Sequence, residues 1–206
     1  MNFQHVNRAR GARGQQRSRA IAKHTDTVIS FFLACFPDFY SATHLTHLAR
    51  EKCARHGLTG PLCGEGRFHV SLYNLLYEEG TLVDFVRQVG VAVEQTANLV
   101  PPFEVRFNRV GSFENKSGNR PFVFLDHNEK TILQQFWGDL GAALRDSGFR
   151  CGKSGFLPHV TLLYDQRSVA EEEVETVSWV VNEFVLVRSF VGETKYDFPE
   201  RWRLCG

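Results

Sequence analysis

Two short stretches of the chain share one pattern of chemically capable side chains. His69–Leu72 (HVSL) and His159–Leu162 (HVTL) each place a hydroxyl two residues after an imidazole, and the second His follows the first by 90 positions. Both stretches lie in runs of Val, Leu, Tyr and Phe bounded by Gly or Pro, which favours β-strands. Alternate side chains of a strand leave the same face. Each stretch should therefore direct its imidazole and its hydroxyl to one side, about 7 Å apart along the strand.

A pair of imidazoles can supply both an acid and a base. Histidine is the side chain whose ordinary pKa lies nearest neutrality, so a neutral ring can accept a proton and a protonated ring can donate one. The hydroxyls of Ser71 and Thr161 can hold a phosphoryl oxygen, and phosphoryl transfer depends mostly on positioning and charge stabilisation. Such a site suits a phosphodiester with its own leaving hydroxyl, for example a 2′,3′-cyclic ribose phosphate. One His would activate water and the other would protonate the departing ribose oxygen, and this chemistry requires neither a metal nor another cofactor.

The hydrophobic pattern indicates the elements that must position these side chains. Amphipathic helices are predicted at 41–56, 81–98 and 129–147, and strands at 28–36, 67–76, 103–107, 121–125, 157–164 and 179–190. The Glu171–Glu173 run is interpreted as a solvated helical turn, and the aromatic segment Tyr196–Leu204 is expected to pack back on the body.

The order of these elements suggests an internal duplication. Each His strand follows an amphipathic helix, as expected for two related α+β lobes. Duplicated lobes commonly pack about a pseudo-two-fold axis, which would bring the two His strands face to face across a single cleft. A lone His-Val-Thr-Leu would be weak evidence, because a half-buried His is usually a core residue. Two copies in the same context are far more specific.

Composition places the chain among folded proteins without an apparent membrane segment. Of its 206 residues 43% are hydrophobic, which allows one domain or two small lobes with a shared core. No apolar run reaches about 18 residues and no signal peptide is visible. The five cysteines match no zinc or redox motif, so we expect reduced thiols in a cytoplasmic compartment.

Residues 1–24 differ in composition from the rest of the chain. They carry six basic residues and no acid, whereas residues 25–206 carry 18 basic and 23 acidic residues. We interpret 1–24 as a basic flexible tail and 25–206 as a single catalytic domain. An RNA-tethering arm and an organelle presequence are the alternative interpretations of the tail.

The two motifs, their strand context and their separation resemble the two-histidine (2H) phosphoesterase superfamily, in particular its bacterial 2′-5′ RNA ligase and RNA 2′,3′-cyclic phosphodiesterase branch. The resemblance covers residues 28–204, from the opening strand at Phe31–Ala34 to the closing segment that ends at Trp202–Leu204. It implies a bilobal α+β fold with outer helices and an active cleft between two antiparallel sheets. It also implies His69 and His159 as the acid and base, with Ser71 and Thr161 binding phosphate. Members hydrolyse 2′,3′-cyclic phosphate ends to 2′-phosphates, and some join tRNA halves through 2′-5′ bonds.

One departure from that pattern concerns the cation that would steady the phosphate. Family members often carry Arg two residues after the Leu of the second motif, where this chain has Tyr164. Arg120, Lys153 and Lys116 could supply a positive charge from loops.

Two further features bear on the substrate. Tyr73 is expected on the face of His69 and Ser71, where it could stack on a base or pack on a neighbouring strand. The Gly-rich segment Cys151–Gly155 contains a Gly-Lys-Ser sequence but lacks the context of a phosphate loop, and we interpret it as a loop at the mouth of the cleft.

Three functions fit these observations. The first is a cyclic phosphodiesterase acting on RNA 3′ ends or cyclic nucleotides, and the second is 2′-5′ RNA ligation at the same site. The third is a module that binds a nucleotide or an RNA end without turnover, which the missing Arg at position 164 keeps open. We expect a monomer that does not associate with membranes.

Overall fold

The structure is a computed structural model that describes residues 28–77, 80–114, 118–128, 130–152 and 155–206. The basic tail 1–24, Lys116 and Lys153 lie outside these ranges. In chain order the described elements are β1 (Ile29–Cys35), α1 (Phe39–His56), the 3-10 helix η1 (Glu65–Arg67), β2 (Val70–Leu75), α2 (Leu82–Leu99), β3 (Phe103–Ser112), β4 (Arg120–Leu125), α3 (Ile132–Asp146), β5 (His159–Asp165), β6 (Glu172–Val181), β7 (Glu183–Phe190) and β8 (Lys195–Arg203).

The three α-helices begin at side-chain caps and match the predicted helices to within a few residues. Asp38, Thr81 and Thr131 each accept a hydrogen bond from a backbone N–H three residues on, which satisfies a donor that the first helical turn leaves free. Helix α1 ends at Gly57, whose φ of 64° lies in the left-handed region that favours glycine. The predicted strands are also confirmed, and the segment 179–190 is divided between β6 and β7.

The prediction of a helical turn at Glu171–Glu173 is wrong. Glu172 and Glu173 belong to strand β6, which pairs with β3. The reason is long-range charge pairing that the local sequence does not reveal. Glu172 Oε1 lies 3.1 Å from Lys52 Nζ, and Lys52 is buried on α1. The carboxylate therefore lies against a helix instead of facing solvent.

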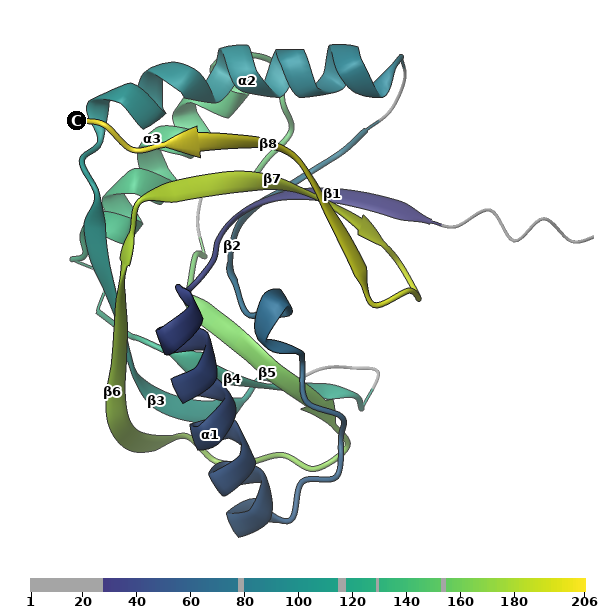
Figure 1. The fold of residues 1–206 in the computed structure, drawn as a ribbon, viewed down its shortest axis with the longest axis vertical. Helices are drawn as coiled ribbons and strands as arrows, with labels where there is room; N and C mark the ends of the chain where they lie inside the picture. Colours follow the sequence, from purple (N-terminus) through teal and green to yellow (C-terminus); the bar gives the residue numbers. More distant parts are fainter. Residues whose placement is uncertain (1–27, 78–79, 115–117, 129, 153–154) are drawn as a thin grey trace, which may run out of the picture.

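All eight strands form one sheet, in the order β6-β3-β4-β5-β2-β1-β7-β8. This corrects the expectation of two separate sheets, although the sheet has two recognisable halves. We call β2, β1, β7 and β8 the first half, and β6, β3, β4 and β5 the second half. They join between β2 and β5, where the antiparallel register gives Val70 opposite Val160 (Figure 1). The pseudo-two-fold relation between the halves stays a prediction.

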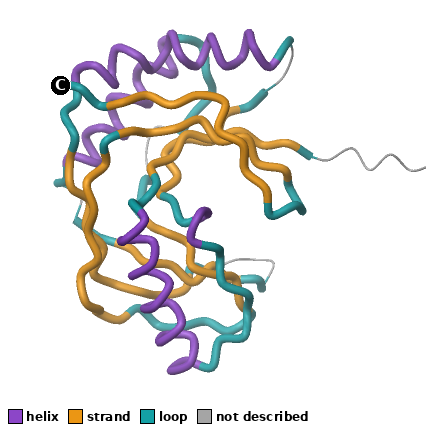
Figure 2. Tube along the Cα trace, viewed as in Figure 1, coloured by secondary structure: helices purple, strands orange, loops and turns teal. Residues whose placement is uncertain are grey.

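The helices make the two halves interdependent. Helix α1 connects β1 to β2 in the first half but packs on β5 and β6 of the second half. Helix α3 connects β4 to β5 in the second half and packs on both halves, with Phe136 against Phe184 of β7 at 5.3 Å and against Phe103 of β3 at 5.6 Å between ring centroids. Figure 2 shows α1 beside one half and α2 and α3 over the other. Neither half is thus covered only by its own connecting helix.

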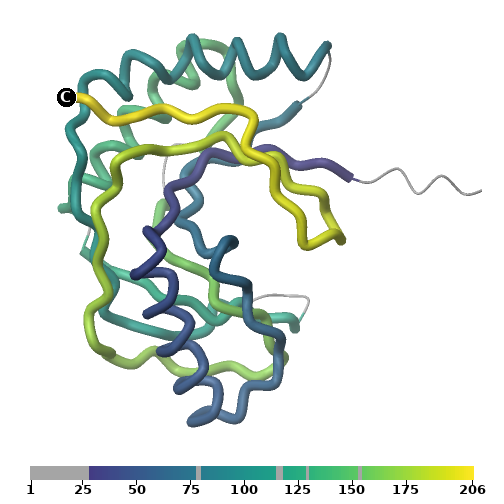
Figure 3. The backbone as a smooth tube through the Cα atoms, viewed as in Figure 1, coloured from purple at the N-terminus to yellow at the C-terminus, as the bar shows by residue number. Residues whose placement is uncertain are grey.

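The C-terminal segment packs on the body, as the sequence predicts. Strand β8 pairs with β7, and Trp202 stacks on Phe184 with ring centroids 5.2 Å apart. Beyond it, the backbone N–H of Cys205 donates to the carbonyl of Ala97 at the end of α2, and the two segments run close together in Figure 3. In the part of the chain that the structure describes, none of the helices is both long and apolar enough to cross a membrane.

Candidate active site

The two histidines are held by the same local contact. His69 Nδ1 lies 2.6 Å from the carbonyl oxygen of Arg67, and His159 Nδ1 lies 2.8 Å from that of Leu157. A carbonyl oxygen can only accept, so each Nδ1 carries the proton and donates it to the residue two positions earlier. The Nε2 atom of each neutral ring is therefore left with a lone pair that can accept a proton.

The register between β2 and β5 brings the two motifs together on one sheet face. Val70 and Val160 are each the second residue of their motif, and they lie opposite each other in the antiparallel pairing of β2 with β5. The two motifs are therefore paired at equivalent positions. His69, Ser71, His159 and Thr161 are all half-buried, whereas the Val residues between them are buried in the core. We call the surface that carries these four side chains the histidine face.

A β-bulge follows the hydroxyl in each motif. Leu33 lies opposite Tyr73 while Ala34 lies opposite Ser71, so β2 contains one extra residue at Leu72. Strand β5 contains the same irregularity at Leu162, because Thr161 and Leu163 pair with successive residues of β4. A bulge leaves its residue out of the ladder and bends the strand.

The carbonyl groups of the two bulged residues are satisfied from outside the sheet. Trp137 of α3 donates from Nε1 to the Leu72 carbonyl at 2.9 Å, and the backbone N–H of Cys63 donates to the Leu162 carbonyl at 2.7 Å. The two irregularities are therefore stabilised features of the site.

The bulges also change which side chains share the histidine face. The expectation that Tyr73 lies beside Ser71 on that face is wrong, because the extra residue turns Tyr73 to the opposite side. Tyr73 is only 4% exposed, stacks on Trp137 with ring centroids 5.0 Å apart, and donates to the Trp137 carbonyl. Tyr73 is therefore part of the core and not available to a base.

Because of the bulge, the residue three positions after each hydroxyl lies on the histidine face, where strict alternation would place the residue two positions after it. Asn74 lies opposite Phe32, and Tyr164 lies opposite Pro121, in registers that put Asn74 on the face of Ser71 and Tyr164 on the face of Thr161. Tyr164 is 47% exposed. Sequence reasoning missed Asn74, because strict alternation cannot anticipate a bulge.

Aromatic rings surround His69 and control its charge. Its ring stacks on Phe32 at 5.0 Å and contacts Phe36 and Tyr196 at 5.5 and 5.9 Å between ring centroids. Burial is the main cause that lowers the pKa of His69 to about 4. The charges of His159 and Arg67 act in the same direction, against the Arg67 carbonyl hydrogen bond that raises the pKa. The pairing of Val70 with Val160 brings the two imidazoles to neighbouring strands, so a charge on His159 opposes a charge on His69.

His159 has a similar but smaller shift. Phe113 packs edge-on against its ring at 4.9 Å, and burial lowers the pKa of His159 below its ordinary value. Both imidazoles are therefore neutral at pH 7 in the free protein. Each imidazole can act as a base without a change of protonation state, whereas an acid role requires a ligand that raises the pKa of the ring.

The segment before His69 is fixed by a buried carboxylate of β5. Asp165 accepts from the backbone N–H groups of Thr59 and Gly60 at 2.7 and 2.8 Å. The backbone hydrogen bond from Arg167, followed by those from Thr59 and Gly60, keeps the pKa of Asp165 below its ordinary value. A Cβ at Gly60 would lie 1.9 Å from the Tyr164 carbonyl oxygen, so this close approach requires glycine. The loop that leads to Arg67 is thus tied to the end of the second motif strand.

Of the proposed loop cations, the structure describes Arg120. Its Nε lies 3.1 Å from a carboxylate oxygen of Glu114, and its Nη1 donates to the Gln166 carbonyl. Its role toward substrate stays a prediction. Arg67, which the sequence reasoning did not select, covers the Tyr196 ring that contacts His69. Arg67 lies two residues before His69, and strand alternation over that spacing could have indicated that both residues are on the same side.

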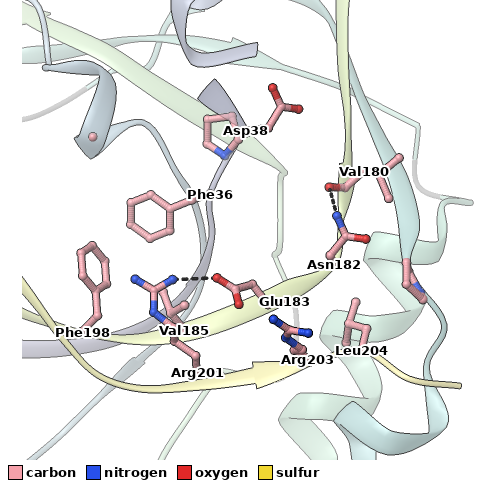
Figure 4. Close-up of a pocket in the computed structure, with 13 residues that line it drawn as sticks. Phe36, Asp38, Val180, Asn182, Glu183, Val185, Phe198, Arg201, Arg203 and Leu204 are labelled. Carbon is pink, nitrogen blue, oxygen red and sulfur yellow. Dashed lines mark hydrogen bonds and ion pairs between the residues drawn. The ribbon is translucent and has the colours of Figure 1, made fainter. Parts of the chain in front are cut away.

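A pocket of about 710 Å³ adjoins the histidine face. Phe36 belongs to both, because its ring contacts His69 and also lines the pocket (Figure 4). Phe198, whose ring packs edge-on against Phe36 at 5.4 Å between centroids, and the Glu183–Arg201 ion pair also line the pocket. The pocket therefore presents aromatic and charged groups, and it is separated from His69 by the side chain of Phe36.

An α+β protein with two equivalent His-hydroxyl motifs on neighbouring strands is the arrangement of a two-histidine phosphoesterase. Residues 42–193 match the family described as the 2'-5' RNA ligase superfamily, and the chain belongs to this family. A search of curated proteins gave no significant match.

Solved structures share the fold. The crystal structure of TT0787 of Thermus thermophilus has a TM-score of 0.66 and 21% identity, covering 86% of this chain and 98% of its own. The apo form of E. coli LigT has a TM-score of 0.66 and 22% identity, covering 87% of this chain and 99% of its own. The complex of E. coli LigT with 3'-AMP gives a TM-score of 0.65 and 22% identity, covering 86% and 98%.

Proposed function

We propose that this protein is a phosphodiesterase that opens 2′,3′-cyclic phosphates of RNA 3′ ends or nucleotides to 2′-phosphates. The observation that carries the proposal is the matched presentation of two imidazoles. Each has Nδ1 bonded to a backbone carbonyl, and each stands two residues before a hydroxyl on the same sheet face.

In the proposed reaction, one neutral imidazole takes a proton from water through Nε2 as the water oxygen bonds to phosphorus. The bond between phosphorus and the ribose 3′ oxygen breaks, and the other imidazole, protonated, donates its proton to that oxygen. The hydroxyls of Ser71 and Thr161 donate to the phosphoryl oxygens. An anionic phosphate beside a buried imidazole raises its pKa and so supplies the protonated form that the free protein lacks.

A nucleotide substrate is compatible with the surroundings of the site. E. coli LigT, which shares the fold, has been crystallised with 3'-AMP and with phosphate. In this chain the pocket beside Phe36 lies next to His69, so a nucleotide whose phosphate binds at the histidine face can place its base there.

The test is hydrolysis of 2′,3′-cyclic AMP with excess chelator, with the product identified by phosphorus NMR. His69→Ala and His159→Ala should each lower kcat/KM by about 10²-fold or more, because each removes an acid or a base. His47→Ala, at an exposed position of α1, is the matched control and should leave the rate unchanged.

Two results would change the assignment. Equal rates for the wild type and both active-site variants would eliminate the phosphodiesterase. Binding of the nucleotide without any product would favour the non-catalytic module on the same site. In a separate assay with RNA fragments that carry a 2′,3′-cyclic phosphate end and a 5′-hydroxyl end, joining of the fragments would show that the site also runs the reaction toward 2′-5′ ligation.

A further inference from the structure

Arg67 is a partly buried cation whose hydrogen-bonding capacity is incompletely used. Its Cζ lies 4.9 Å from the centroid of the Tyr196 ring, and its Nη2 lies 3.4 Å from the Tyr196 hydroxyl. Its Nε is buried and has no hydrogen-bond partner. Among the described residues no carboxylate forms an ion pair with it. A buried donor without an acceptor is costly, and a guanidinium in this state is suited to an anion.

The guanidinium lies beside the histidine face. The same Tyr196 ring that it covers contacts the His69 ring edge-on at 5.9 Å. The backbone of Arg67 also holds His69, whose Nδ1 donates to its carbonyl. The charge of Arg67 lowers the pKa of His69, after the larger effect of burial. One residue therefore fixes the imidazole through its carbonyl and places a positive charge next to it.

Tyr164 connects Arg67 to the second motif. It occupies the position where an arginine would follow the second hydroxyl, and the register of β5 with β4 puts it on the face of Thr161. Burial raises the pKa of Tyr164, and the charge of Arg67 opposes this rise. Arg67 and Tyr164 thus lie near each other, so an arginine at 164 would repel the guanidinium already there.

Other described arginines near the sheet are engaged by acids. Arg120 pairs with Glu114, Arg188 pairs with Asp197, and Arg109 pairs with Glu171 and Glu173. Each of these carboxylates neutralises the cation that it contacts. Arg67 is therefore the described arginine best able to receive an external anion at the histidine face.

We propose that Arg67, held against Tyr196, is the phosphate-binding cation of this site and takes the place of the arginine that is absent at position 164. Its ligand is the phosphoryl group of the substrate or, without substrate, inorganic phosphate. This inference rests on the proposed function for its substrate, but phosphate binding can be measured without turnover.

The test is calorimetric titration of the full chain with inorganic phosphate. Arg67→Met, which keeps the length of the stem and removes the charge, should weaken binding by about 10- to 100-fold, the usual weight of charge-assisted hydrogen bonds. Adding Tyr164→Arg to that variant should restore most of the affinity, because it returns a guanidinium to the same surface. Arg106→Met, at an exposed position of β3, is the matched control and should bind phosphate as the wild type does.

The outcomes separate this proposal from the enzymatic one. Unchanged phosphate affinity in Arg67→Met, or failure of Tyr164→Arg to restore a lost affinity, overturns the role of Arg67. Should Arg67→Met not fold, Arg67→Lys decides, since loss of the forked donor must weaken phosphate binding several-fold. If phosphate binding depends on Arg67 while the His variants retain full hydrolysis, the proposed reaction fails and the phosphate site stands.

Discussion

At the scale of single residues, the environment of the two imidazoles lowers the pKa of both rings. Both are partly buried against aromatic rings, and both are tied through Nδ1 to the backbone. This arrangement fixes the tautomer and suppresses the charge in the free protein. A neutral pair is ready to accept a proton, and under the proposed function the arriving phosphate would determine which ring becomes the acid.

The depressed pKa of His69 predicts a specific dependence of stability on pH. In the unfolded chain His69 gains a proton below about pH 6.5, whereas in the folded protein it does so only near pH 4. Between these values the unfolded state binds more protons, so the free energy of unfolding should fall as the pH falls.

Urea unfolding of His69→Gln over this range checks the effect, because the variant lacks the titrating group. Its stability should fall less steeply than that of the wild type between about pH 6.5 and about pH 4. His47→Gln, at an exposed position, should retain the wild-type slope. Identical slopes in all three proteins would show that the His69 ring is not buried as described.

At the scale of elements, the packing of α3 on β2 positions the first motif. Tyr73 donates to the Trp137 carbonyl while Trp137 donates to the Leu72 carbonyl, so the helix and the bulge hold each other. Gly141 makes this close approach possible, since a Cβ there would lie 2.0 Å from the Tyr73 hydroxyl oxygen.

Gly141→Ala should therefore destabilise the protein by about 1–3 kcal/mol, because the added methyl displaces Tyr73 from its site. Gly138→Ala in the same helix is the matched control, since a Cβ there meets no atom within 4 Å. That control should be neutral or stabilising by up to about 1 kcal/mol through helix propensity. Chemical denaturation measures both, and a Gly141→Ala variant as stable as its control would contradict the packing.

At the scale of the whole molecule, the packing of helices across the two halves determines how the protein unfolds. The halves share one sheet, α1 packs on the half that does not contain the strands it connects, and α3 packs on both halves. Opening either half would therefore expose a face of the other. We expect a single cooperative transition in urea.

The three tryptophans report on the cooperativity of unfolding, because they lie in different elements. Trp137 is in α3, Trp179 in β6 and Trp202 in β8. Fluorescence from single-tryptophan variants and far-ultraviolet circular dichroism should give coincident unfolding curves. Separate midpoints for the Trp179 and Trp202 signals would show that the halves unfold independently.

The sequence by itself determined the elements and the candidate site. The hydrophobic periodicity and the capping residues are local signals, so they located the helices and most strands, and the repeated HVSL and HVTL stretches indicated His69, Ser71, His159 and Thr161 as the candidate site residues. These side chains share a face because strand alternation holds over the short distance from each His to its hydroxyl.

Only the tertiary structure decided the rest. The single sheet, the packing of helices across its two halves and the pairing of Glu172 with α1 depend on contacts between distant segments. The bulges at Leu72 and Leu162 moved Tyr73 into the core and left Tyr164 beside Thr161. Arg67 came to the site through the folding of a loop onto Asp165. Local patterns fix what each segment can form, whereas the free energy of burying polar groups, which requires partners from elsewhere in the chain, selects where each segment lies.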